Sequence, residues 1–342
     1  MRDTELARRG ADNLVQSHLR LQPGERLVLF HLEAAEVLSV LREALRDAGG
    51  ELIDAPLEAW RDSGTDDAFE RFVKSHAADA DASLYVSSVT GPVFARAQRL
   101  IQTLEGTRVR HLHVPGVSLR MLGGSLRADP TLIERINERL AEHLETGKVL
   151  HVKSPKGTDL EVELRHSYPI VRYCGVPEPG SWDSVPTGAV SFHSPAVSGT
   201  FVADRIVSGT HVERPNASLF RRPLTLTISG GRLRDHQSDD EELVRELRDH
   251  LASDADADYV GFVSMSTNYL TRNELKVFAN DALLPGLRLM LGYSDPHKTK
   301  APRSASVWAT FHGRKHTVSV DGRVIVRDGR IDAQWTQGIL PF

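Results

Sequence analysis

The sequence is poor in the residues that cross-link secreted proteins and in those that span membranes. Its 342 residues include one cysteine, Cys174, which excludes an internal disulfide and a cysteine-based zinc site. No apolar run approaches the roughly 20 residues that a membrane helix requires. Residues 1–15 mix acidic with basic side chains and lack an apolar core segment. We therefore expect no secretory signal and a cytoplasmic location.

Phosphate-binding motifs are also missing. Neither GxGxxG after a strand nor GxxxxGK[ST] occurs, so nothing in the sequence supports a nucleotide site. The 42 basic and 46 acidic residues give a formal charge of −4, which offers no electrostatic reason to expect nucleic acid as a partner. With 40% hydrophobic and 26% charged residues, the composition is typical of a soluble globular protein.

The length favours two domains, because single cores stop growing at about 250 to 300 residues. In residues 1–147 helical periodicity, as in residues 4–19 and 66–76, alternates with short extended segments. Those segments are residues 27–30, 51–57, 82–88 and 109–114. Such alternation predicts an α/β domain built on a mainly parallel sheet. Asp129-Pro130 is a favourable helix start and predicts a helix to about residue 145.

Beyond Gly147 the pattern changes to paired strands. Residues 148–152 and 159–164 flank a hairpin-like turn at residues 155–157. One helix is expected at residues 239–251, and the remaining extended segments are residues 224–228, 259–265, 287–293, 304–311, 316–320 and 324–327. The sequence therefore predicts a second domain, residues 148–342, of mixed α+β structure.

One stretch, residues 180–204, combines turn-forming residues with short extended pieces. Glycines and prolines punctuate it at Gly180, Pro186, Gly188, Pro195 and Gly199. Loops and strands of this kind line clefts more often than they fill plain core. We therefore expect this stretch to form the floor of a cleft in the second domain.

The same stretch carries a family resemblance. Pro186-Thr187-Gly188, followed by Pro195 and Gly199-Thr200, resembles the metal-site segment of the aminopeptidase T family of two-metal exopeptidases. Further matching pieces are residues 21–25 (LQPGE), 157–160 (GTDL) and 321–322 (DG). The resemblance implies a two-domain aminopeptidase T fold, a homodimer, and a C-terminal domain that holds two divalent metals.

The metal ligands that this resemblance implies are not found at the matching positions. Aligned on the local motifs, the ligand positions are occupied by Ala189, Phe262, Arg288, Val307 and Ala309. A two-metal site needs several carboxylates and imidazoles to neutralise the cations. We therefore expect no metal and no other cofactor. The related ferrous dioxygenase branch, which acts on dihydroxypyridines, would also need His and Asp ligands, so the same loss argues against that activity.

Other residues could give the former metal cleft a new role. His193 shares a face with Ala189 and Ser191 if this piece is extended, which makes it the candidate proton-transfer residue. The alternative is a surface or hydrogen-bonded histidine. Arg288 could bind a carboxylate or a peptide terminus in a bidentate manner. Its alternative is a salt bridge that fills the vacated cavity.

The remaining ligand-binding candidates are Tyr293, Phe262, Trp308 and Asn268. Together they describe an apolar pocket with one or two polar groups, which suits a peptide or an aromatic small molecule. His312 and His316 have the spacing of a metal pair, but they flank a turn. His312 also alternates away from Val307 and Ala309, so a metal role is not expected.

Three functions follow from these residues. The first is a metal-independent, repurposed relative that binds a peptide or amino-acid-like ligand and, in one form, modifies or cyclises a peptide in natural-product maturation. The second is a non-catalytic pseudoenzyme that serves as a binding or assembly partner. The third is a metal-dependent aminopeptidase whose ligands lie at other positions than the alignment gives. No nucleic acid or membrane partner is expected in any of them.

Overall fold

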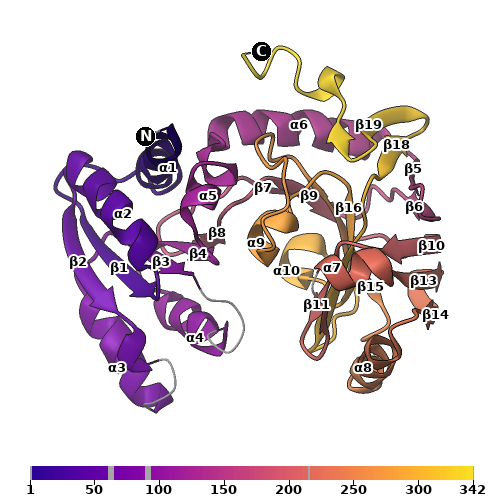
Figure 1. Cartoon of the computed structure of the whole chain (residues 1–342), viewed down its shortest axis with the longest axis horizontal. Coiled ribbons are helices and arrows are strands. Elements are labelled where there is room, and N and C mark those ends of the chain that lie inside the picture. The colour runs from indigo at the N-terminus through magenta and orange to yellow at the C-terminus, as the bar shows by residue number, and fades with distance from the viewer. Residues whose placement is uncertain (1, 61–64, 89–93, 215, 342) are drawn as a thin grey trace. The chain divides into compact units, whose positions relative to one another are not determined.

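A computed structural model describes residues 2–60, 65–88, 94–214 and 216–341. By their internal contacts these residues form two compact units. Unit 1 comprises residues 1–131 and 174–187, and unit 2 comprises residues 132–173 and 188–342. Figure 1 labels their helices and strands. Among the described helices, none combines the length and apolar character that a membrane span requires.

Unit 1 is built on sheet A, which is entirely parallel. In spatial order its strands are β2 (Glu51–Pro56), β1 (Arg26–Leu32), β3 (Ala82–Ser87), β4 (Arg110–Pro115) and β8 (Trp182–Ser184). Its helices are α1 (Arg2–Asp12), continued by a π-helix (Asn13–His18), α2 (Ala35–Asp47), α3 (Asp66–Ala77), α4 (Phe94–Leu104) and α5 (Leu119–Leu122), with short 3₁₀ turns at Glu58–Trp60 and Ser125–Arg127.

Local sequence explains where these helices begin and which side they bury. Thr65 caps α3 by accepting a hydrogen bond from the Ala68 amide. Phe69 and Val73 of α3 then pack with Phe30 of β1 and Leu100 of α4 in one apolar core. The periodicity in the sequence thus predicted both the helices and the parallel sheet of this unit.

Unit 2 contains two antiparallel sheets. Sheet B has the order β14 (Arg232–Gln237), β13 (Leu224–Ser229), β10 (Val197–Ala203), β6 (Asp159–Glu163), β5 (Val149–Lys153), β18 (Thr317–Val320), β19 (Arg323–Arg327) and β20 (Arg330–Ile331). Sheet C has the order β12 (Glu213–Arg214), β11 (Ile206–Gly209), β17 (Trp308–His312), β16 (Leu287–Gly292), β15 (Val260–Ser266), β9 (Ala189–Phe192) and β7 (Val171–Tyr173).

The helices of unit 2 are fewer. They are α6 (Pro130–Thr146), α7 (Asn216–Arg221), α8 (Glu241–Ala252), α9 (Phe278–Asp281) and α10 (Pro296–Thr299), followed by a 3₁₀ turn at Ala333–Trp335. Asp240 caps α8 by accepting a hydrogen bond from the Leu243 amide. The predicted fold class, a parallel α/β part followed by a mixed α+β part, is confirmed.

The contacts divide the chain at other places than residue 147. Ile136, Leu140 and Leu144 of α6 pack in one core with Leu150 and Val162 of sheet B, so this helix belongs with unit 2 almost from its start. Residues 174–187 return to unit 1, because β8 adds a fifth parallel strand beside β4. The stretch 180–204 therefore supplies an edge strand to sheet A and then β9 and β10 to unit 2. The sequence offered no signal for this crossing, since β8 is three residues long.

Candidate functional site

Sheet C has two chemically different faces. One carries Val263, Leu289 and Phe311, which are buried in the core of unit 2. On the other face Ser191, Ser264, Arg288 and His312 stand in one row across β9, β15, β16 and β17, each paired with the next. Directly paired residues on antiparallel strands point to the same side. We call this side, defined by those four residues, the polar face of sheet C.

The hydroxyl groups of the row are already satisfied. Ser191 Oγ donates to Ser264 Oγ at 2.9 Å, and both serines are buried. His312 is buried as well. Burial, followed by the nearby charges of Arg205, His316 and Arg288, holds the pKa of His312 well below its usual value. His312 is therefore neutral at pH 7 and contributes no charge to the polar face.

Arg288 is the charged group of the row. Its residue surface is partly exposed, but its Nε is buried without a hydrogen-bond partner. Burial lowers the pKa of Arg288 and the neighbouring Tyr173 opposes this effect, yet a guanidinium stays protonated at neutral pH. Among the described residues, no carboxylate forms a salt bridge with Arg288. The salt bridge considered as an alternative from the sequence is therefore not found in this part of the chain.

Glu274 forms an ion-pair cluster with two other arginines of unit 2. Glu274 accepts from Arg314 Nη2 at 2.7 Å and Nε at 2.9 Å, and from Arg205 Nε at 3.2 Å. Those two arginines lower the pKa of Glu274 against its partial burial, so it is ionised and paired. Arg288 is not part of this cluster, and its positive charge has no carboxylate partner among the described residues.

A second cation lies near the row. Tyr173 of β7 pairs with Ala189, and the Lys298 ammonium lies 4.9 Å from the centre of the Tyr173 ring. Lys298 belongs to α10, a single turn that follows the strand of Arg288. Its acidic neighbour Asp295 is 4.0 Å away, which is a weak ion pair. Sequence reasoning did not single out Tyr173 or Lys298 as a pair, because they are far apart in the chain and β7 is too short to show periodicity.

Apolar side chains continue the same face beyond Arg288. Phe262 and Met290 are paired on β15 and β16, and Trp308 pairs with Gly292 further along. Phe278 of α9 contacts Trp308 with 6.5 Å between ring centres, and its side chain is 38% exposed. The predicted candidates Phe262, Trp308 and Arg288 are therefore brought together on one face.

His193 has a different environment from the one expected. It is buried, its Nδ1 lies 2.8 Å from the Gly261 carbonyl oxygen, and its Nε2 lies 2.8 Å from the Tyr259 hydroxyl. The carbonyl can only accept, so Nδ1 carries the proton and Nε2 accepts from Tyr259. Burial lowers the pKa of His193. Both ring nitrogens are therefore engaged, as in the hydrogen-bonded alternative.

Asn268 and Tyr293 lie just beyond the ends of strands β15 and β16. The Asn268 side-chain oxygen accepts from the amides of Leu270 and Thr271, which stabilises the turn after β15. Tyr293 follows the end of β16 and is 44% exposed. Their assignment as ligand-binding residues stays a prediction.

The register corrects two positions of the sequence alignment. Val307 and Ala309 were expected to face the former metal cavity together with Phe262 and Arg288. Ala309 instead pairs with Leu291 and is buried in the core, and Val307 packs in a small apolar cluster with Ala257 and Ala305. On β17 the residues that share a side with Arg288 are Trp308, Thr310 and His312. Val307 and Ala309 therefore do not lie on the same side of the sheet as Arg288.

The donor chemistry of the polar face does not fit a metal centre. The row offers two hydroxyls, one guanidinium and one neutral imidazole, with Ala189 and Phe262 nearby. Throughout the residues that the structure describes, no three His, Cys, Asp or Glu side chains are grouped so as to hold a metal ion. A cation beside Arg288 would also be repelled.

Known proteins share the fold. The structure of 2,5-dihydroxypyridine dioxygenase from Pseudomonas putida KT2440 matches with a TM-score of 0.64 and 17% identity, over 98% of this chain and 99% of that one. Wild-type AmpT from Thermus thermophilus matches with a TM-score of 0.65 and 16% identity, over 96% and 99%. The likeness to aminopeptidase T is thus confirmed for the fold. None of the curated sequences compared with the chain matches it.

The family of the chain is shown by a match to a sequence model, which is independent of the structural comparisons. The model of the NicX family, described as 2,5-dihydroxypyridine 5,6-dioxygenase, matches residues 16–263, which is more than half of the chain. The family expected from the motifs was aminopeptidase T, and the dioxygenase branch was set aside. The chain belongs to the NicX family.

Proposed function

We propose that this chain binds a small carboxylate, of the kind found on amino acids and peptide C-termini, at Arg288 and without a metal. The observation that carries the proposal is the guanidinium of Arg288, which lies on the polar face of sheet C without an acidic partner among the described residues. A charged donor left unpaired in a partly buried place is costly unless a ligand pairs with it.

The neighbouring side chains support this ligand class. A carboxylate accepts two parallel hydrogen bonds from one guanidinium, and Lys298 near Tyr173 adds a second positive charge. Phe262, Met290 and Trp308 next to Arg288 would contact the apolar part of the same ligand. In chemical terms, the positive charge that would attract the ligand is supplied by a side chain, Arg288, and not by a metal ion.

Binding is better supported than turnover. His193, the candidate proton-transfer residue, has both nitrogens in hydrogen bonds with Tyr259 and Gly261. That arrangement favours the non-catalytic pseudoenzyme over a peptide-modifying or peptide-cyclising enzyme. An aminopeptidase or a dioxygenase would need a set of metal ligands that the described residues do not supply. The homodimer stays a prediction.

The proposal is tested by titrating N-acetyl-leucine, N-acetyl-phenylalanine and leucyl-glycine, each beside its C-terminal amide, in a calorimeter. The acids should bind and the amides should not. Arg288→Gln should weaken binding of the acids about 10- to 100-fold, the range of a charge-assisted hydrogen bond. Arg234→Gln, at an exposed arginine of β14, is the matched control and should leave affinity unchanged.

A second variant supplies a carboxylate from the protein itself, which should compete with the ligand for Arg288. Ser264 is the direct cross-strand partner of Arg288, so Ser264→Asp places a carboxylate beside the guanidinium. It should abolish ligand binding while the protein stays folded. Equal binding of acids and amides, or full affinity in Arg288→Gln, would reject Arg288 as the anchor.

A further inference from the structure

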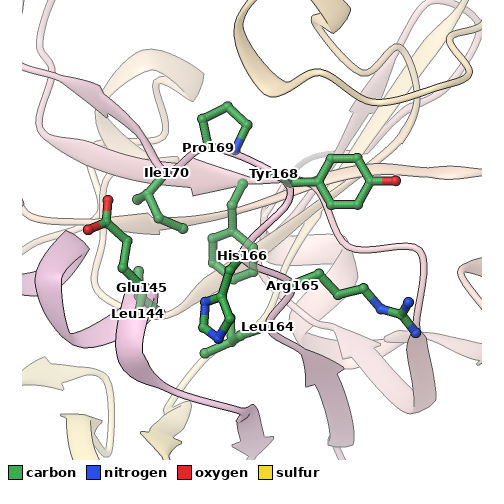
Figure 2. A pocket seen from close by; sticks show the side chains of 9 residues that line it. Leu144, Glu145, Leu164, Arg165, His166, Tyr168, Pro169 and Ile170 are labelled. Atoms are coloured by element: carbon green, nitrogen blue, oxygen red, sulfur yellow. The ribbon is translucent and has the colours of Figure 1, made fainter.

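A groove in unit 2, separate from the polar face of sheet C, runs along α6. Its first part is a cavity of about 230 Å³ between the end of α6 and residues 164–170. Figure 2 shows the side chains that line it, with Glu145 on the same side as Ile170. Its second part, about 360 Å³, continues along α6 and shares Glu145 and Ile170 with the first. The two parts together form what we call the α6 groove.

The floor of the α6 groove is apolar. Leu144, Leu164 and Phe192 line the cavity and belong to the core of unit 2, and Ile170 packs against that core from the side. Covering apolar surface that remains open to solvent beside a core is favourable, because it removes that surface from water. The floor therefore suits one apolar side chain of a bound molecule.

The rim of the α6 groove is acidic. Glu138, Glu142 and Glu145 are spaced by four and three residues and so lie along one side of the helix. Glu138 is within 3.5 Å of Arg172, which also reaches Glu134 at 3.2 Å. Glu142 and Glu145 are exposed, and among the described residues their carboxylates have no hydrogen-bond or salt-bridge partner.

The basic groups beside the groove do not cancel this charge. Arg172 is shared between two glutamates, and Arg165 is held by Glu163 at 3.0 Å. His166 is exposed on the cavity wall. The three glutamates of the rim and Arg172 leave a formal net charge of −2 along the groove.

We infer that the α6 groove binds a basic peptide segment, with one apolar side chain in the cavity and lysine or arginine residues beside Glu138, Glu142 and Glu145. The apolar floor and the acidic rim, in which Glu142 and Glu145 have no partner among the described residues, are complementary to those two kinds of side chain. Charge complementarity sets which partner is accepted. This inference is independent of Arg288, since none of its residues lies on the polar face of sheet C.

Fluorescence anisotropy at pH 7.5 tests the inference with three labelled peptides. KKLFKK has both features, KKSSKK lacks the apolar pair, and EELFEE reverses the charge. Only KKLFKK should bind, and raising the salt from 0.05 to 0.5 M should weaken it. Binding of EELFEE with equal affinity would overturn the inference.

Two variants separate the rim from the floor. Glu142→Gln with Glu145→Gln should weaken KKLFKK about three- to tenfold, as expected for two exposed charge pairs. Ile170→Thr, which keeps the β-branched shape, should weaken it about fivefold through the lost apolar contact. The matched control is Glu36→Gln with Glu241→Gln, two exposed helical glutamates elsewhere, which should change nothing. An equal loss in that control would attribute binding to overall charge and overturn the inference.

Gel filtration of the wild type and of the Glu142→Gln, Glu145→Gln variant tests whether a second copy of this chain, and not a peptide, fills the groove. Self-association that disappears in the variant would mean that a second copy of this chain fills the groove, and would overturn the peptide assignment. An unchanged elution volume in both proteins, together with selective binding of KKLFKK, is the expected result.

Discussion

Arg288 and His312 are direct cross-strand partners on the polar face of sheet C, and the positive charge of Arg288 disfavours a metal ion beside them. The guanidinium is positive, and burial together with Arg205, His316 and Arg288 itself keeps His312 neutral. A neutral imidazole beside an unpaired guanidinium favours an anionic ligand over a cation. The chain therefore combines the fold that it shares with its structural relatives with a polar face that carries a positive charge.

The first prediction concerns metal content. Because the polar face lacks acidic ligands, the purified protein should contain far less than one equivalent of iron, zinc, manganese or cobalt by elemental analysis. Treatment with a chelator followed by desalting should leave carboxylate binding unchanged. Stoichiometric metal that is lost together with ligand binding would contradict both the proposed function and the assignment of this face.

The second prediction tests the register of β17. Ala309 is fully buried in the core, so Ala309→Asp should lower the free energy of unfolding by about 3 to 5 kcal/mol or prevent folding, because it buries an unpaired charge. Met290→Asp, at a partly exposed position on the polar face, should cost about 1 kcal/mol. Urea denaturation measures both. Equal tolerance of the two changes would mean that position 309 faces the cleft, as the alignment had it.

The contrast between these positions shows what the sequence could and could not predict. Regular periodicity in the helices and in the strands of sheet A depends on local burial, and it was sufficient for the fold class. Periodicity was not sufficient to predict which residues of β17 face which side of the sheet, because both faces of this strand are buried. Ala309, Thr310, Phe311 and His312 are all inaccessible to solvent. A strand buried on both sides has no polar and apolar alternation to fix which residues face a site.

Arg288 and His193 also show what one sequence cannot predict. Both residues were identified from the sequence, but their roles depend on partners that are distant in the chain. Tyr259 and Gly261 engage His193 from β15 and the residue before it, and Tyr173 of β7 is the neighbour that affects the pKa of Arg288. Such partnerships come from strand register, which one sequence does not reveal.

The third prediction is acid sensitivity between pH 7 and 5. Burial lowers the pKa of His18 to about 4, of His113 to about 4 and of His316 to about 3, against about 6.5 in the unfolded chain. Protonation therefore favours the unfolded state. The stabilising contribution is complete above pH 6.5 and is lost as the pH falls toward the folded-state pKa. Each histidine should contribute a loss of about 2 kcal/mol between pH 7 and 5.

Chemical denaturation at both pH values measures this loss. His113→Gln removes one titrating group and should reduce the difference between pH 7 and 5 by about 2 kcal/mol, although the variant is less stable at pH 7 through its lost stacking on Tyr85. His297→Gln, at an exposed histidine, is the control and should leave the difference unchanged. A pH dependence that is the same in all three proteins would reject the buried neutral state of His113.

The last prediction concerns the support of the polar face. Asn137 of α6 is fully buried; its side-chain nitrogen donates to the Tyr173 carbonyl at 3.1 Å, and its oxygen accepts from the Thr267 hydroxyl at 2.6 Å. It thus fixes both Tyr173, which neighbours Arg288, and the turn that contains Asn268. Asn137→Ala should cost about 1 to 3 kcal/mol, since it removes both of these hydrogen bonds and the buried Thr267 hydroxyl loses its acceptor.

A double-mutant cycle separates this bond from general packing. Thr267→Val alone should destabilise because the Asn137 oxygen loses its donor, and Asn137→Leu alone should destabilise because the Thr267 hydroxyl loses its acceptor. Combining the two removes both polar groups, so the double variant should be more stable than the sum of the single changes by about 1 kcal/mol or more. Carboxylate affinity should fall in every variant that contains Asn137→Leu, because the Tyr173 carbonyl is then released and Arg288 loses its positioned neighbour. Strict additivity in stability, or full affinity in those variants, would mean that Asn137 does not hold the polar face in place.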